Sequence, residues 1–386
     1  MKILIVTFRY PFPEVGGEYV RINNIARYLK RQGHEVILLS LFNPKESSRE
    51  TDNDLYAKTF FSYRISIFSY IYTFFAVLLG PPLQIGYFFS FLFLFKLISI
   101  LRREKPDKII LHTIRTTQYF FLLKRSSNVI VEATDALSKT YSQCKKNFSW
   151  KSFNFMQFLY GIEQRRIKKY EKKVTSFFPK TIFVSDNDVE YVGACSTIEC
   201  KPNGVDVFPS RAKPDPNKIV FVGNMRSLQN EDAAIYFIEE VFPLIQKTNQ
   251  QAVFYIVGAN PSQKLKKLSK THANIVVTGY VDNIDLFIED AAVSVAPIRY
   301  AAGIQNKILV SLAHHLPVVI SPLIAKGIPE LKDNFNCFIC SDPDGFASCC
   351  LKCIERTKEI ELIEENGYNT VKTNYSWDSK LSGYLD

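Results

Sequence analysis

The sequence predicts an α/β protein built from two doubly wound domains, each a parallel sheet with helices on both faces. The first forty residues follow the order strand, loop, helix, strand, and strands and helices alternate again beyond residue 217. The length agrees, because 386 residues at about 150 per domain correspond to two or three domains. Hydrophobic residues make up 47% and charged residues 22%, which excludes a mainly disordered chain.

The opening βαβ unit is visible in its hydrophobic pattern. Residues 2–7 form an apolar run, as expected of a parallel strand buried on both faces. After a loop rich in Pro and Gly, residues 18–32 place apolar side chains on one side of a helix and basic ones on the other. Gly33 ends that helix, and residues 35–41 form a second strand. The N-terminal apolar run is too short for a signal peptide, so we expect a cytoplasmic protein.

The second half repeats this logic after a proline-rich join that runs from residue 202 to residue 218. Its predicted strands are residues 218–222, 252–257, 274–278, 293–296 and 317–320. The predicted helices between them are at about residues 230–247, 261–270, 283–290 and 305–314. Ligands of such sheets bind at the carboxyl ends of the strands, so we expect the two domains to face each other across a ligand cleft.

The chain has eight cysteines, which raises the question of disulfides or a metal. A chain of this length and core content does not need a disulfide framework, so we expect free thiols. Cys337-x2-Cys340 and Cys350-x2-Cys353 have a spacing that zinc sites use. However, the pairs fall on a short apolar strand and on the apolar face of a helix. We therefore interpret these cysteines as small buried hydrophobic residues and predict no metal site.

Positive charge and aromatic residues are concentrated in the first half. Residues 1–205 hold 30 Lys and Arg against 17 Asp and Glu, whereas residues 206–386 hold 18 against 21. Residues 65–95 contain no charged residue and are rich in Phe and Tyr. We predict an aromatic insertion at about residues 61–101 that lies in the interface of an anionic membrane.

Other interpretations of this half stay open. The aromatic stretch consists of two apolar blocks, residues 65–79 and 83–100, and each is of marginal length for a spanning helix. A two-helix hairpin through the bilayer is therefore one alternative. An ordinary aromatic core beside solvated basic faces is another. We expect no nucleic-acid partner, because zinc-finger, RNA-binding and helix-turn-helix patterns are missing and the aromatic residues do not alternate with Lys and Arg.

Three loops at predicted strand ends have the composition of phosphate-binding sites. Glycine lets a ligand approach the backbone, and a helix N-terminus attracts anions. The loops contain Gly16 and Gly17, with Arg21 one turn into the helix; Gly223, Asn224 and Arg226; and Gly303, Ile304, Gln305, Asn306 and Lys307. Arg, Lys and a helix dipole can hold a diphosphate without a metal, and none of these three loops contains an Asp-x-Asp motif.

His112 ends the predicted strand at residues 108–111. Most histidines are structural, but a carboxyl strand end is where ligands of this kind of sheet bind. We therefore predict a catalytic role for His112. No Ser/His/Asp or Cys/His signature of acyl transfer is found.

In their order and spacing, the short motifs of the chain resemble those of GT-B glycosyltransferases, specifically the GT4-like (glycosyltransferase group 1) family. They are Pro11-x-Pro13, Gly16-Gly17, Gly33-His34-Glu35-Val36, Pro202-Asn203-Gly204-Val205-Asp206, Phe221-Val222-Gly223-Asn224-Met225, Val277-Thr278-Gly279-Tyr280-Val281, Gly303-Ile304-Gln305-Asn306-Lys307 and Leu316-Pro317-Val318-Val319. Two further segments, residues 83–88 and Glu132-x2-Asp135-x2-Ser138, resemble the subgroup that builds bacterial surface polysaccharides.

The resemblance implies two Rossmann-like domains at residues 1–205 and 206–365, and a closing helix at residues 366–386 that crosses back to the first domain. It implies an enzyme, a hexosyltransferase-type glycosyltransferase, that transfers a sugar from a nucleotide-sugar to an acceptor hydroxyl with retention and without a metal. The nucleotide-sugar would be a co-substrate, and no cofactor is expected. The first domain would hold a lipid-linked or oligosaccharide acceptor, with the protein peripherally bound to the inner face of the membrane.

The resemblance also assigns catalytic roles to His112, Lys307 and Arg226. The histidine would lie beside the reacting sugar, and the two cations would stabilise the departing diphosphate, which can take the proton of the acceptor. The nucleotide base would lie near Tyr280 and Val281. The residues expected to bind the donor are Gly16, Gly17, Gly223, Asn224, Tyr280, Val281, Gly303, Ile304, Gln305 and Asn306.

One position departs from the family pattern. The family often carries Glu-x7-Glu, whose second Glu binds the donor ribose, but Ala302 and Val310 occupy those positions here. Loss of such a charge-assisted hydrogen bond predicts donor binding weakened by about 1.5–3 kcal/mol. This departure motivates one alternative, a catalytically degenerate GT-B protein that serves as a partner of another transferase. A sugar-nucleotide epimerase on the same scaffold is a further alternative.

Overall fold

The chain forms two compact units in a computed structural model that describes residues 1–12, 14, 17–42, 54–63, 70–73, 81–123, 127–146, 155–300 and 305–386. The first unit comprises Met1–Asn203 together with Leu381–Asp386, and the second comprises Gly204–Lys380. The first division lies beside the predicted boundary at residue 205. The predicted return at residue 366 falls inside helix α16 (Lys358–Asn374), so the chain rejoins the first unit later than we expected.

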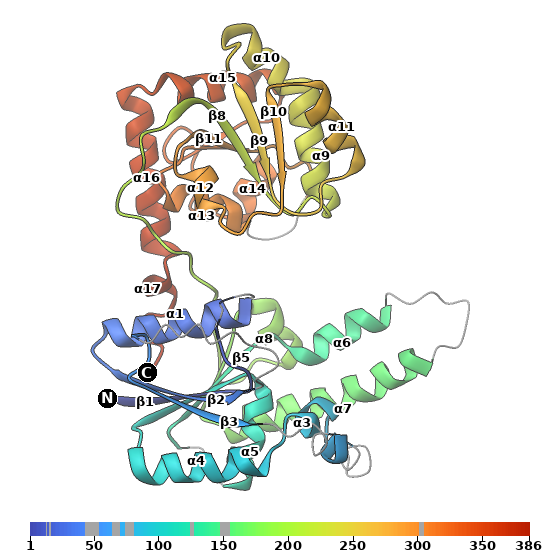
Figure 1. The fold of residues 1–386 in the computed structure, drawn as a ribbon, viewed down its shortest axis with the longest axis vertical. Coiled ribbons are helices and arrows are strands. Elements are labelled where there is room, and N and C mark those ends of the chain that lie inside the picture. The colour runs from blue at the N-terminus through green and yellow to red at the C-terminus, as the bar shows by residue number, and fades with distance from the viewer. Residues whose placement is uncertain are drawn as a thin grey trace. The chain divides into compact units, whose positions relative to one another are not determined.

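The first unit contains a parallel sheet with its described strands in the order β3-β2-β1-β4-β5-β6-β7 (Figure 1). Every neighbouring pair is parallel. Ile3, Leu4, Ile5 and Val6 of β1 are fully buried, as the uninterrupted apolar run predicts. The strands are β1 (Lys2–Thr7), β2 (Glu35–Phe42), β3 (Lys58–Tyr63), β4 (Lys108–His112), β5 (Val129–Thr134), β6 (Lys180–Phe183) and β7 (Ile198–Cys200).

Helices cover both faces of this sheet, with α1 and α4 on opposite sides (Figure 1). Helix α1 buries Ile22, Ile25 and Leu29, the apolar side that its sequence pattern predicts. The helices of the first unit are α1 (Gly17–Arg31), α3 (Leu83–Tyr87), α4 (Phe91–Glu104), α5 (Thr117–Leu122), α6 (Leu137–Lys146), α7 (Phe155–Phe177) and α8 (Asp186–Val192), with a 3-10 turn at Ile114–Thr116.

The aromatic insertion expected at residues 61–101 contributes to the core and also to the surface. Helix α4 buries Phe93, Leu97 and Ile100 in the core of the first unit. Its other face exposes three large apolar side chains, those of Phe91, Leu92 and Phe95. Among the described helices, none is both long enough and apolar enough to cross a bilayer. Most of the first apolar block, which spans residues 65–79, lies outside the described residues.

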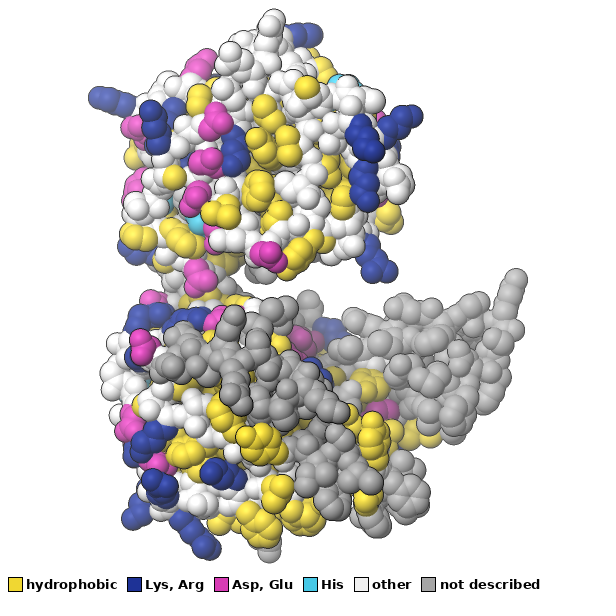
Figure 2. Space-filling model, viewed as in Figure 1, with side chains coloured by type: hydrophobic (Ala, Val, Ile, Leu, Met, Phe, Trp, Pro, Cys, Tyr) yellow, Lys and Arg dark blue, Asp and Glu magenta, His cyan; other side chains and the backbone are white. Residues whose placement is uncertain are grey.

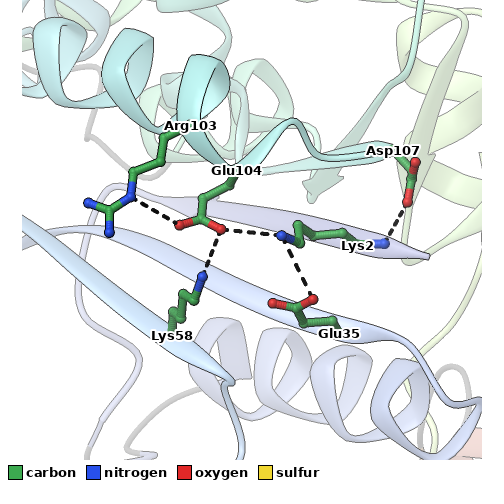
Figure 3. A network of polar contacts seen from close by, with 6 residues as sticks. All are labelled: Lys2, Glu35, Lys58, Arg103, Glu104 and Asp107. Carbon is green, nitrogen blue, oxygen red and sulfur yellow. Dashed lines mark hydrogen bonds and ion pairs between the residues drawn. The ribbon is translucent and has the colours of Figure 1, made fainter.

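The carboxyl end of α4 is fixed to the amino ends of three strands (Figure 3). The Glu104 carboxylate accepts hydrogen bonds from Lys58 Nζ at 2.8 Å and from Lys2 Nζ at 3.3 Å. Glu35, at the start of β2, lies 3.9 Å from Lys2 Nζ. The hydrogen bond from Lys58 is the main cause of a lowered pKa at Glu104. These ion pairs orient α4, and with it the exposed apolar face.

The second unit contains a parallel sheet in the order β10-β9-β8-β11-β12-β13. Alternate residues of β8 point to opposite faces, since Ile219 and Phe221 join one core while Val220 and Val222 join the other. The strands are β8 (Asp215–Val222), β9 (Val253–Val257), β10 (Ile275–Gly279), β11 (Ala291–Ala296), β12 (Val318–Ile320) and β13 (Phe338–Ile339), close to the predicted ranges.

The helix predicted at residues 230–247 is divided by a π-helical turn at Phe237–Val241. Pro243, which has no backbone N–H to donate, stands at the start of the helix that follows the turn. The helices of the second unit are α9 (Leu228–Tyr236), α10 (Phe242–Thr248), α11 (Gln263–Thr271), α12 (Asp285–Ile288), α13 (Asn306–Ala313), α14 (Pro322–Gly327), α15 (Pro343–Glu355), α16 and α17 (Trp377–Lys380).

The cysteines considered for zinc are core residues of the second unit. Cys337, Cys340, Cys350 and Cys353 are all buried and carry free thiols. They pack in the same hydrophobic cluster as Phe221 and its neighbours. Within the described ranges, no three His, Cys, Asp or Glu side chains are grouped so that they could hold a metal ion.

Candidate functional site: a half-buried lysine at the strand ends of the second unit

The loop after β8 is held by the side chain of Asn230, near the start of α9. Asn230 Nδ2 donates to the carbonyl oxygen of Asn224 at 3.0 Å. Gly223 is required here for packing, because a Cβ at this position would lie 2.8 Å from Asn230 Nδ2. Gly258, with φ of 147°, comes so close to the Gly223 carbonyl that a Cβ there would lie 1.9 Å from it. The glycine that we predicted as a phosphate-loop residue thus also admits the side chain of Asn230.

Asn230 also binds Lys307, which lies in the first turn of α13. Lys307 Nζ donates to Asn230 Oδ1 at 2.7 Å and lies 4.4 Å from the centre of the Phe221 ring. Among the described residues, no carboxylate forms an ion pair with this ammonium group. Burial therefore lowers the pKa of Lys307 to about 7. The sheet edge holds a partly desolvated amine that a nearby anion would return to full protonation.

The remaining residues of the predicted phosphate site lie around this amine or outside the described residues. Gln305 precedes the N-terminus of α13, and Asn306 is its first residue. The backbone N–H of Arg226 donates to Asn224 Oδ1 at 3.0 Å, and the Arg226 side chain is exposed. The two residues Gly303 and Ile304 lie outside the described residues. Gly223, Asn224 and Lys307 are thus joined through Asn230, a residue to which the sequence pattern gave no role.

The residues predicted for the nucleotide base follow β10. Tyr280 is 73% exposed, whereas Val281 packs on the apolar cluster that covers the second face of the sheet. Val310 of α13 packs on the same cluster, together with Leu316. The valine found where the family often has a ribose-binding Glu is therefore part of an apolar surface that it shares with Val281.

In the first unit, His112 is buried at the end of β4. Neither ring nitrogen has a hydrogen-bond partner among the described residues. Burial, followed by the charges of Arg21 and Arg115, lowers the pKa of His112 to about 3, so its imidazole is neutral at physiological pH. Gly17 begins α1, and a Cβ there would meet no atom within 4 Å. Gly16 lies outside the described residues.

Arg21 is not available to a phosphate, contrary to the prediction from its place in α1. Its side chain is fully buried, and its Nε donates to Glu132 Oε1 at 2.8 Å. Its Nη1 donates to Asn203 Oδ1 at 2.9 Å, and Tyr384 Oη donates to the other Glu132 oxygen at 2.8 Å. This network fixes the last residues of the chain and the end of the first unit to its sheet. Glu132, a charged residue within an apolar strand, was the signal in the sequence.

The two parallel-sheet units match GT-B glycosyltransferases along their whole length. HepE from Anabaena, solved in complex with UDP, has a TM-score of 0.56 at 13% identity and covers 100% of this chain and 99% of its own. TarM has a TM-score of 0.58 at 11% identity over 100% and 98%. The lipopolysaccharide outer core galactosyltransferase WaaB has a TM-score of 0.55 at 11% identity over 100% and 99%. The protein therefore has the GT-B fold.

The family follows from the sequence models. Residues 15–207 match the model described as Glycosyltransferase Family 4, and residues 216–356 match Glycosyl transferases group 1. The chain belongs to glycosyltransferase family 4 and is a glycosyltransferase. An uncharacterized 44.6 kDa protein in the cps region of Klebsiella pneumoniae is 21% identical over 98% of this chain and 97% of its own length. An uncharacterized glycosyltransferase of Methanocaldococcus jannaschii is 22% identical over 68% and 67%.

A half-buried amine kept for a ligand should reduce the stability of the free protein. The pKa of Lys307 in the folded protein lies below its unfolded value of 10.5. At pH values below 10.5, this shift therefore lowers the free energy of unfolding. We expect Lys307→Met to raise the free energy of unfolding at pH 7 by about 1–3 kcal/mol, because each unit of pKa shift corresponds to about 1.4 kcal/mol and the lost hydrogen bond offsets part of it. The gain should vanish above pH 10.5.

Denaturant unfolding at pH 7 and pH 11 measures this difference. Lys247→Met, which removes an exposed lysine of α10, is the matched control and should change stability little at either pH. A Lys307→Met protein less stable than wild type at pH 7 would show that the amine serves the fold.

Proposed function

We propose that this glycosyltransferase transfers a sugar from a nucleotide-sugar, bound on the second unit, to a lipid-linked saccharide acceptor bound on the first unit. The observation that carries the proposal is the Lys307 amine. Its pKa is lowered to about 7, and among the described residues its hydrogen-bond partner is the neutral side chain of Asn230. A diphosphate beside Lys307 would supply the missing negative charge. The N-terminus of α13 adds its own positive potential at the same place.

We propose that the reaction proceeds with retention and without a metal or another cofactor. The charge that develops on the leaving diphosphate can be stabilised by Lys307, by Arg226 and by the backbone N–H groups at the start of α13. The diphosphate can then accept the proton of the attacking hydroxyl. Neutral His112 can hydrogen-bond a sugar hydroxyl, which is consistent with its two unpartnered ring nitrogens.

We propose surface polysaccharide biosynthesis as the role of the protein. One relative is encoded in the cps region of Klebsiella pneumoniae, and one structural neighbour is a lipopolysaccharide outer core galactosyltransferase. The Lys307 site supports an active enzyme over a catalytically degenerate partner, because a degenerate protein would gain nothing from keeping a partly desolvated amine without an anionic partner.

We propose that the first unit binds the inner face of a membrane through α4. Phe91, Leu92 and Phe95 are 50%, 51% and 65% exposed at its amino half, while Arg102 and Arg103 are exposed at its carboxyl end. Hydrophobic side chains gather along the lower edge of the first unit, where α4 lies, with Lys and Arg further to the left (Figure 2). An apolar stripe next to basic residues fits the interface of an anionic bilayer.

Donor binding is tested by calorimetric titration with UDP-, GDP-, ADP- and CMP-sugars, with and without EDTA. We expect one nucleotide class to bind, EDTA to have no effect, and Lys307→Ala to weaken affinity about tenfold to a hundredfold, the value of a hydrogen bond to a charged group. Lys247→Ala should bind normally. The proposal fails if none of the donors binds at millimolar concentration, with or without acceptor lipid.

Membrane binding is tested by flotation with liposomes that contain or lack anionic lipid. We expect binding that requires anionic lipid, decreases with salt, and decreases strongly in the double variant Leu92→Ser, Phe95→Ser, because apolar area and charge both contribute. Leu286→Ser and Leu362→Ser, which alter leucines of the second unit that are each 61% exposed, are matched controls. Flotation that does not depend on salt, or equal flotation of the double variant and the wild type, would show that α4 is not the membrane-binding surface.

A further inference from the structure

We propose that Arg9 and Arg115 of the first unit bind a phosphate group that is attached to the lipid of the acceptor. The identification of this ligand as the acceptor rests on the proposed function. The site itself lies wholly within the first unit, on the loops that follow β1 and β4, and includes none of the residues predicted to bind the donor diphosphate.

The two arginines come together because β1 and β4 are neighbours in the sheet. The strands pair in parallel, with Val6 opposite Leu111, so the loops after them leave the sheet side by side. The guanidinium carbon of Arg115 lies 4.7 Å from the centre of the Phe8 ring, and that of Arg9 lies 5.6 Å from it. Both guanidinium groups also lie over the Phe88 ring, at 5.7 and 6.0 Å. Two cations therefore share one aromatic platform.

Arg115 is mostly buried, yet its hydrogen bonds go to a neutral group. Its Nε and Nη2 donate to Gln84 Oε1 at 3.0 and 2.8 Å. Glu18 Oε1 forms an ion pair with Nη1 at 3.9 Å, a distance too long for a hydrogen bond. Burial lowers the pKa of Arg115; the charge of Glu18 opposes this shift, and the charge of Arg9 adds to it. An anion placed between the two arginines would relieve both costs.

The same sheet edge has further features of a binding site. Thr7, Thr113 and Thr134 lie at or just after the ends of the neighbouring strands β1, β4 and β5, and their buried hydroxyl groups have no hydrogen-bond partner among the described residues. Thr113 and Thr134 both have a φ of 67°, which is strained for β-branched residues. Unpaired polar atoms and backbone strain concentrate where proteins bind ligands.

The aromatic residues beside the arginines favour a phosphate on a lipid over a free anion. The Phe88 ring packs edge-on against Phe8 at 4.9 Å and against Tyr87 at 5.1 Å. Phe89, the next residue, packs against Phe91 of the exposed face of α4 at 5.0 Å. The cationic pair thus adjoins an apolar segment that reaches the surface proposed to meet the membrane. A phosphate with an isoprenoid or other hydrocarbon chain could contact the two arginines with its phosphate and the aromatic segment with its chain.

The test is a titration of the full-length protein with farnesyl diphosphate, farnesol and inorganic pyrophosphate, below the concentration at which the lipid forms micelles. We expect farnesyl diphosphate to bind more tightly than either of the others. Arg9→Gln and Arg115→Gln should each weaken it about tenfold or more, the value of a charge-assisted hydrogen bond. Arg165→Gln removes an exposed arginine of α7 and is the matched control, with unchanged affinity expected.

Arg9 is exposed, so Arg9→Gln is expected to fold even if Arg115→Gln does not, and circular dichroism checks both. Equal affinity for farnesol and farnesyl diphosphate, or unchanged affinity in a folded Arg9→Gln protein, would overturn the proposal. Equal affinity for pyrophosphate and farnesyl diphosphate would overturn its lipid part. Nucleotide-sugar binding, measured separately on the same variants, should not change. If the wild-type protein binds no nucleotide-sugar, the proposed function is contradicted. The titrations of the arginine variants with farnesyl diphosphate still test the phosphate site independently.

Discussion

A cation that is removed from water must be paired with an anion or lose its proton, and this constraint organises the polar interior of both units. Arg21 in the first unit and Arg211 in the second meet it with internal carboxylates. Arg21 pairs with Glu132 at 2.8 Å, and Arg211 pairs with Glu364 at 2.7 Å. Because all four side chains are buried, either pair would be expensive to break, and each connects segments that are far apart in the sequence.

Two other cations are bound differently. Lys307 donates to the neutral Asn230, and Arg115 donates to the neutral Gln84, with its nearest ion-pair partner, Glu18, 3.9 Å away. Both lie at the carboxyl ends of their sheets, where ligands of doubly wound folds bind. We propose that the pairs of Arg21 and Arg211 with internal carboxylates stabilise the fold. Lys307 and Arg115 are instead proposed to bind anionic ligands, the donor diphosphate in the second unit and the acceptor phosphate in the first. The valine at position 310 fits this account, because it leaves donor affinity more dependent on the phosphates.

The sequence was sufficient to predict the sheet of the second unit and three strands of the first, but it did not reveal β3, β5, β6 and β7. Parallel strands buried on both faces leave uninterrupted apolar runs such as Ile3–Val6, and these are read without knowledge of their neighbours. Side-chain partners are a different matter. Arg21 was predicted to face a phosphate because nothing local reveals that Glu132, 111 residues away, would bind it. The role of Asn230 was missed for the same reason, since its partners Asn224 and Lys307 meet it only in the folded unit.

The central claim, that Lys307 is held for the donor diphosphate, is tested most directly by counting protons. Calorimetric titration of the nucleotide-sugar that binds, at pH 7.5 in buffers of different ionisation enthalpy, gives the number of protons taken up on binding. A lysine whose pKa rises from about 7 when the diphosphate binds must take up a large fraction of one proton at this pH, and Lys307→Met must abolish the uptake. Donor binding without proton uptake in the wild type, or equal uptake in the variant, would contradict the account.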